Sequence, residues 1–302
     1  MDLVPEDASV VLVAQPAQLV SAPAARRVLD AIASDDALER YRAHTGIDPR
    51  RLEQLVWAET GAGSVLLVRG PFSAPLAVAE MGHRMLPVEA SAEAPFVRRV
   101  GHYQGARRDL VALSQHVLVA ITGAPSLAQE VLRRAEGGPR GGGRGAPSVL
   151  SSEPVASMLA AHPESPLFVV APRPLGLPID APIGLLLARQ RGLFVGATPS
   201  GPDAIAIAAE LWGEFPPEAG ANFRALAESL AQSDLGVVLG MNDALPTLGV
   251  RADAERVSLR ATFSAPAVAA GLHVLLGAEI ADIVEVSVDA PVPGAALGPR
   301  PD

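Results

Sequence analysis

The residues best suited to chemistry gather between positions 98 and 109. Polar side chains follow one another closely there: Arg98, Arg99, His102, Tyr103, Gln104, Arg107, Arg108 and Asp109. Guanidinium groups bind carboxylate and phosphate oxygens through paired hydrogen bonds, and an imidazole exchanges protons near neutral pH. The stretch therefore predicts an anion-binding site formed by Arg98, Arg99, His102, Tyr103, Arg107 and Arg108, with His102 as a general acid or base.

A second explanation of the same cluster needs no ligand. Charged side chains on an edge strand and its turn prevent that strand from pairing with the sheet of another molecule. We favour this explanation over the anion site.

Other catalytic or metal sites are not indicated. The histidines do not recur at the three- or four-residue spacing of a helical metal site: His44, His83, His102, His116, His162 and His273. The sequence has no cysteine and no lysine, which excludes a thiol nucleophile, a thiolate metal site, a P-loop lysine and a Schiff base. It also has no G-x-S-x-G nucleophile elbow. We assign no catalytic residue and expect neither metal nor cofactor.

Composition indicates a globular chain without the positive charge that favours non-specific binding to nucleic acid. Of its 302 residues 49% are hydrophobic and 19% charged, and this length is sufficient for two domains. A net charge of −9 argues against non-specific binding to DNA, RNA or anionic membrane. No apolar stretch approaches the roughly 18–20 residues of a membrane-spanning helix. Met1 to Pro5 does not read as a signal peptide, and the absence of cysteine fits an exported protein as well as a cytosolic one.

Apolar patterning places the strands. β-Branched or alternating runs predict strands at 9–14, 96–103, 167–170 and 257–263. The same patterns predict hairpins that join 55–58 with 65–68, 110–113 with 116–121, and 193–197 with 204–211.

Short Ala-Pro stretches mark the helix starts. Ser21-Ala22-Pro23, Ser73-Ala74-Pro75 and Ser264-Ala265-Pro266 are almost the same, and Gly123-Ala124-Pro125 and Asp180-Ala181-Pro182 are variants. Serine or aspartate caps the free N–H groups of a helix, and proline suits the first turn. We therefore expect helices to begin at 21–23, 73–75 and 264–266. Asp35 and Asp36 indicate a further helix start, because acids suit a helix N-terminus.

A stretch rich in glycine, proline and arginine, 137–149, predicts a linker or loop between two halves. The N-terminal lobe is expected at 1–136, the C-terminal lobe at 150–290, and a disordered Pro/Gly tail at 291–302. Both halves can be written β-α-β-β-α-β-β-α, with one extra strand in the first. The prediction is an α+β fold of two lobes, each an antiparallel or mixed sheet covered by helices. The shared order suggests a divergent duplication.

Two stretches carry a family resemblance. Ser64-Val-Leu-Leu-Val-Arg-Gly-Pro-Phe72 precedes one predicted helix, and the stretch from Tyr103 to Ser126 leads into another. They are similar in pattern to uncharacterised, often exported or lipid-anchored α+β proteins of GC-rich bacteria, of the DUF3352 type. This resemblance covers most of the chain and implies an envelope location and no established activity. The chain has no signal peptide or lipobox cysteine, so a periplasmic or envelope location is expected if a native signal was removed, and a cytoplasmic one otherwise.

Three functions follow from these observations. We favour a non-enzymatic binding or structural protein of the bacterial cell envelope, with a protein or small-molecule partner that the sequence does not identify. The second is an enzyme that acts on an anionic substrate through the cluster from Arg98 to Asp109. The third is a carrier of an apolar ligand between sheet and helices, because the packing residues are small and aromatic residues are only 4%.

Overall fold

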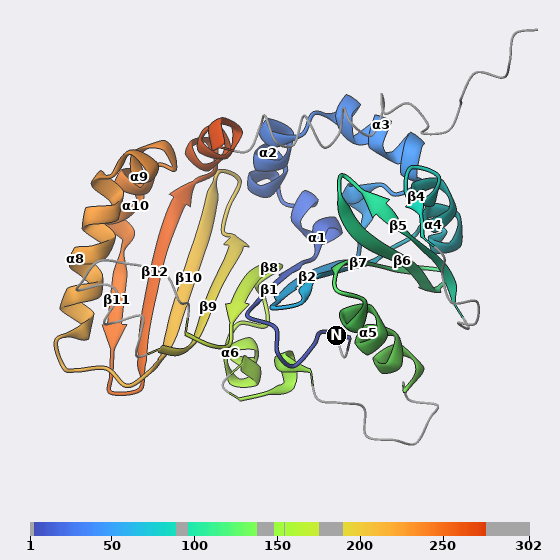
Figure 1. Ribbon diagram of the computed structural model, residues 1–302. Helices are drawn as coiled ribbons and strands as arrows, with labels where there is room; N and C mark the ends of the chain where they lie inside the picture. Colours follow the sequence, from blue (N-terminus) through green and yellow to red (C-terminus); the bar gives the residue numbers. More distant parts are fainter. Residues whose placement is uncertain (1–2, 89–95, 138–147, 154, 175–189, 276–302) are drawn as a thin grey trace, which may run out of the picture.

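The structure, a computed structural model, describes residues 3–88, 96–137, 148–153, 155–174 and 190–275 (Figure 1). The strands are β1 (Val10–Ala14), β2 (Gln54–Thr60), β3 (Gly63–Arg69), β4 (Leu86–Pro87), β5 (Val97–Tyr103), β6 (Ala106–Ser114), β7 (Val117–Gly123), β8 (Leu167–Ala171), β9 (Gln190–Pro199), β10 (Ala204–Gly213), β11 (Gly249–Ala252) and β12 (Arg256–Ser264).

The helices vary from single turns to 14 residues. The α-helices are α1 (Pro16–Val20), α2 (Pro23–Ile32), α3 (Asp35–Thr45), α4 (Ala74–Gly82), α5 (Pro125–Glu136), α6 (Val155–Ala161), α8 (Ala219–Gln232), α9 (Asp234–Val238) and α10 (Met241–Ala244). The 3₁₀ turns are η1 (Pro49–Arg51), η2 (Val149–Ser151) and η3 (Leu245–Thr247), and residues 265–275 are also helical.

The twelve strands of the described residues form one antiparallel sheet, so the expectation of one sheet per half was wrong. Their order is β11-β12-β10-β9-β8-β1-β2-β3-β7-β6-β5-β4. The two halves join where β1 pairs with β8, and Val11 lies opposite Val170. Because β1 also pairs with β2, both of its edges are used. An antiparallel sheet with helices packed on it is an α+β fold, as the sequence predicted.

The order of strands outward from this seam is the same on both sides. It runs β1-β2-β3-β7-β6 in the first half and β8-β9-β10-β12-β11 in the second. The first half adds β5 and the two-residue β4 at its edge. The matching order supports the duplication, which stays a prediction.

The sheet has two differently covered faces. On one face the largest core contains Val11, Val65 and Phe194 and is closed by α5 and α6. On the other face, Val68 and Leu118 pack with Val78 of α4. Neighbouring residues such as Leu67 and Val68 belong to the two different cores because strand side chains alternate. Figure 1 accordingly shows α1, α2 and α3 above the sheet and α5 and α6 below it.

The Ala-Pro helix starts are confirmed, but the capping argument is not. Helix α2 begins at Pro23, α4 at Ala74 and the last described helix at residue 265. The N-cap of α2 is Ala22, and the hydroxyl of Ser21 donates to the carbonyl of Gln18 in the preceding helix. Proline at the first or second position is the feature that these starts share.

The end of the predicted linker overlaps the 3₁₀ turn η2. Ser148 and Val149, the last residues of the predicted linker or loop, are the N-cap and first residue of η2, and the Ser148 hydroxyl accepts from the Leu150 N–H. The rest of the linker, apart from Gly137 at the end of α5, lies outside the described residues, as do the predicted tail and the Asp180 helix start.

Candidate functional site

A cavity of about 560 Å³ lies between the sheet and the helices of its upper face. Every residue that lines it is apolar. They are Pro16, Leu19, Val20, Ala25, Val28, Leu29, Ile32, Pro49, Leu52, Leu55, Leu167, Ala197, Pro199, Ile205, Ile207, Leu239, Met241, Phe263, Val268 and Leu272. Both halves of the chain contribute, so the cavity depends on the single sheet.

The floor of the cavity crosses the seam between the halves. Leu55 of β2 and Leu167 of β8 both lie opposite Ala14 of β1, and Leu167 lies opposite Ala197 of β9. Ala197 in turn lies opposite Ile207 of β10. Residues directly opposite each other share a face, so this row forms a continuous apolar strip. Alanine at two positions of the strip leaves room above it.

Helix α2 covers the strip with one apolar side. Ala25, Val28, Leu29 and Ile32 line the cavity, and they follow the three- and four-residue spacing of a single helix face. The opposite side of α2 carries charged residues, among them Arg26 and Asp30. The helix is therefore amphipathic, with its apolar side on the cavity.

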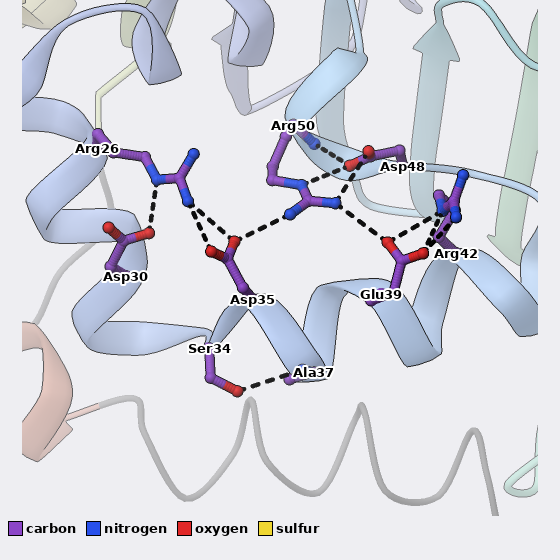
Figure 2. A network of polar contacts seen from close by, with 9 residues as sticks. All are labelled: Arg26, Asp30, Ser34, Asp35, Ala37, Glu39, Arg42, Asp48 and Arg50. Carbon is purple, nitrogen blue, oxygen red and sulfur yellow. Dashed lines mark hydrogen bonds and ion pairs between the residues drawn. The ribbon is translucent and has the colours of Figure 1, made fainter.

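Ion pairs hold α2 to its neighbours on the outer side (Figure 2). Arg26 Nε lies 2.7 Å from Asp30, and its Nη2 lies 2.9 Å from Asp35 at the start of α3. The carboxylate of Asp35 is also 2.9 Å from Arg50 in η1. Arg50 reaches Asp48 as well, at 2.9 Å. One chain of charges thus joins α2, α3 and η1 over the cavity.

The charges of this network alter the ionisation of its members. The hydrogen bond to Asp48 is the largest cause that raises the pKa of Arg50. Burial acts to raise the pKa of Asp48, but hydrogen bonds from the side chain and backbone of Arg50 outweigh it and lower that pKa. The pair is therefore held in its charged form.

Two further contacts tie α2 to the second half. Arg27 forms an ion pair with Asp203 in the turn between β9 and β10. His273 Nδ1 lies 2.6 Å from the carbonyl oxygen of Ala31, at the end of α2. Both contacts lie on the exposed side of the helix, so polar groups surround the cavity without lining it.

The arginine cluster predicted from the sequence is divided between the two faces of the β5–β6 hairpin. Arg98, His102, Arg107 and Asp109 lie on one face, since His102 is opposite Arg107. Asp109 is buried and accepts from Arg98 and from Arg107, whose Nε is 3.2 Å from Oδ2. Two of the predicted anion-binding arginines are thus already paired with a carboxylate.

The other members of the cluster face α4 instead. Arg108 lies over the ring of Tyr103, 4.8 Å from its centre, and the stem of Arg99 lies against Gly82. Gln104 is in the turn, where its φ of 51° and the positive φ of Gly105 suit a two-residue hairpin. The structure does not bring the six predicted residues to one point, and the anion site stays a prediction.

A buried polar group on the lower face was not anticipated. Glu210 Oε1 lies 3.2 Å from Nε2 of His162, and both side chains are almost fully buried. Glu210 also accepts from the indole N–H of Trp212 at 3.3 Å. Phe194 stacks on His162 with ring centres 4.4 Å apart. Only packing between α6, β9 and β10 brings these residues together, so their separation along the chain concealed them.

The described part of the chain contains neither a cluster of metal ligands nor a membrane-spanning helix. Among those residues no group of three or more histidine, aspartate or glutamate side chains could hold a metal ion. One histidine nitrogen is already engaged by the protein: Nδ1 of His116 lies 3.0 Å from the carbonyl oxygen of Phe72. Within the same residues no helix combines the length and the apolar character needed to cross a bilayer.

Comparison with known proteins identifies the fold alone. No family model and no curated protein matches the chain. Among solved structures it is similar to two crystal forms of a protein named TP0453. For form III the TM-score is 0.52 at 10% identity, with 90% of this chain and 97% of the other covered. For form IV the TM-score is 0.50 at 10% identity, with 91% and 95% covered. The likeness therefore extends over almost the whole of both chains.

Proposed function

We propose that the protein is a non-enzymatic binding protein whose cavity takes an apolar ligand. The observation that carries the proposal is the lining, in which all of the residues are apolar. The volume of about 560 Å³ is in the range of roughly 300–1,000 Å³ that small-molecule sites occupy.

The absence of polar side chains among the described lining residues favours a hydrocarbon chain as the class of ligand. Water in such a cavity lacks the two to four polar partners that ordered internal waters use. A ligand with polar groups would lose its own hydrogen bonds on entry. Each methylene group transferred from water contributes about 0.8 kcal/mol, so an alkyl or acyl chain is favoured.

We also propose that the protein works in the bacterial cell envelope. The supporting observation is the resemblance of Ser64 to Phe72 and of Tyr103 to Ser126 to DUF3352-type proteins. We further propose that the two halves arose by duplication, with lobes at 1–136 and 150–290. The equal strand order on the two sides of the β1–β8 seam supports this.

The test uses a fluorescent fatty acid, cis-parinaric acid, titrated into the full chain. Ala197→Phe places a ring in the cavity and should weaken binding at least about tenfold, since the methylenes it displaces are worth about 0.8 kcal/mol each. Ala206→Phe is the matched control, because Ala206 is a half-buried residue of β10 on the opposite face. It should leave the affinity unchanged.

Thermal unfolding of both variants shows whether they remain folded. Equal affinities of the wild type and Ala197→Phe, with both proteins folded, would exclude the cavity as the binding site. No saturable binding of the probe to the wild type would contradict the proposed function itself.

A further inference from the structure

The lower face of β10, β11 and β12 carries a second, polar hollow on the side of the sheet away from the apolar cavity. This groove has a volume of about 330 Å³. Its polar lining consists of Glu210, Arg251, Asp253, Arg256, Ser258 and Arg260. We call it the arginine groove.

The register of the strands explains why the groove is hollow. Ser258 of β12 lies opposite Glu210 on one side and Arg251 on the other. Arg260 lies opposite Gly249. Short side chains at Gly249 and Ser258 leave space in the middle, while the long arginine side chains stand around it.

Positive charge predominates around this space. Within the described residues Arg251 and Arg260 are exposed and form no ion pair. The third guanidinium, of Arg256, is 3.9 Å from Oε1 of Glu210 and lies over the Trp212 ring at 5.8 Å. Three guanidiniums thus surround the groove against two carboxylates, in a protein with a net charge of −9.

Both carboxylates of the groove already have partners. Glu210 is buried at the floor, where His162 and Trp212 contact it. Asp253 Oδ1 accepts from the backbone N–H groups of Glu255 and Arg256 at 2.9 and 2.8 Å, which closes the β11–β12 turn. The Glu210 carboxylate is therefore engaged inside the protein and Asp253 Oδ1 is engaged by the turn, whereas the guanidiniums of Arg251 and Arg260 are exposed without an ion pair among the described residues.

We propose that the arginine groove binds a phosphate group. A guanidinium presents a planar pair of donors that matches two phosphate oxygens, and it is always charged. The terminal oxygens of a phosphate monoester can accept from Arg251, Arg256 and Arg260 together, and its charge at neutral pH exceeds the single charge of a carboxylate. Ser258 supplies a hydroxyl donor at the centre of the groove.

The first test is calorimetric titration of inorganic phosphate into the full chain. We expect Arg251→Gln/Arg260→Gln to weaken binding about tenfold or more, because hydrogen bonds between charged groups are lost. The matched control is Arg191→Gln, whose residue pairs with Glu214 at the end of β9 and does not line the groove. Its affinity for phosphate should equal that of the wild type.

A second arm distinguishes a free phosphate compound from a lipid headgroup. Co-flotation compares vesicles of phosphatidylcholine with and without phosphatidic acid. Binding to the phosphatidic acid vesicles that the double substitution abolishes supports the groove and identifies a headgroup. Binding of inorganic phosphate alone supports the groove and identifies a soluble phosphate. Absence of binding in both arms, or equal weakening in the Arg191→Gln control, overturns the proposal.

Discussion

At the scale of the residue, two buried carboxylates differ in whether the arginines near them are paired or free to bind another group. Asp109 of β6 and Glu210 of β10 lie on one row of directly opposed residues that crosses the sheet. Asp109 pairs with Arg98 and Arg107. Glu210 is contacted by His162, Trp212 and Arg256, whereas the neighbouring Arg251 and Arg260 are exposed. A count of arginines in the sequence does not reveal this difference.

Two serine residues that precede helices also differ in role: one caps its helix and the other does not. Alanine substitution should distinguish them by the stability that is lost. The hydroxyl of Ser34 accepts from the N–H of Ala37 and caps α3, whereas Ser73 makes no cap bond and accepts from Gln115. Ser34→Ala should therefore lower the free energy of unfolding by about 1 kcal/mol. Ser73→Ala should lower it by less than about 0.5 kcal/mol. Urea denaturation measures both, and equal losses would show that the cap is not responsible.

Residue chemistry was only partly predictable from the sequence. The Asp35–Asp36 helix start was right, because acids near a helix N-terminus act locally. The split of the Arg98–Arg108 cluster between two faces follows from the alternation of a strand and could have been derived once β5 and β6 were placed. The contact of His162 with Glu210 could not, since it depends on tertiary packing between residues 162 and 210.

At the scale of the element, α2 is the helix on which the cavity depends. Its apolar side lines the cavity, and its charged side joins the network of Asp35, Asp48 and Arg50 (Figure 2). Only a fifth of the Arg50 side chain is exposed, at 20%, so its ion pairs are screened less than those at the surface. The network stabilises the position of the helices over the cavity.

The network predicts a loss of stability in acid. The pKa of Asp48 in the folded protein is below the ordinary aspartate value of 3.8, so its contribution to stability is complete above that value and disappears as the pH falls through the folded pKa. Asp48→Asn keeps an acceptor for the Arg50 N–H but removes the charge. At neutral pH it should lower the free energy of unfolding by about 1 kcal/mol.

Urea denaturation from about pH 7 to pH 3 measures this difference. The wild type and Asp48→Asn should converge as the pH falls below about 4. A difference in stability that stays constant over the whole range would contradict the role of the Asp48 charge.

Elements were the most predictable level of the structure. The three hairpins were right, including β2 with β3, where Leu55 lies opposite Val68. The starts of α2, α4 and α5 were right as well, because proline in the first turn is a local signal. Alternating patterning also predicted the strand at 257–263, which is β12, although only Val257 of its apolar residues is fully buried.

At the scale of the whole molecule, one sheet replaces the two that the sequence suggested. The strand that joins them, β1, is a run of five apolar residues whose pattern is typical of a strand covered on both faces of a sheet. Nothing in such a run specifies that its second partner lies near residue 170. Long-range pairing of this kind carries no local signal, and the glycine-rich stretch between the halves favoured a division.

The continuous sheet predicts that both halves unfold together. Each half contains one of the two tryptophans, Trp57 in β2 and Trp212 in β10. Trp212→Phe reports on the first half and Trp57→Phe on the second by fluorescence in urea. Each variant should show the same transition midpoint by fluorescence and by circular dichroism. A fluorescence midpoint that differs from the circular dichroism midpoint in either variant would show that the halves unfold separately.

The cavity that this sheet and α2 enclose is the proposed binding site, and native mass spectrometry tests its occupancy most directly. The full chain is incubated with a mixture of saturated fatty acids and dicarboxylic acids of equal length, then transferred to the gas phase intact. We predict one bound fatty acid per chain for the wild type and for Ala206→Phe, little or none for Ala197→Phe, and no bound dicarboxylic acid. A wild-type chain that binds neither ligand, or binds both equally, would contradict an apolar binding site.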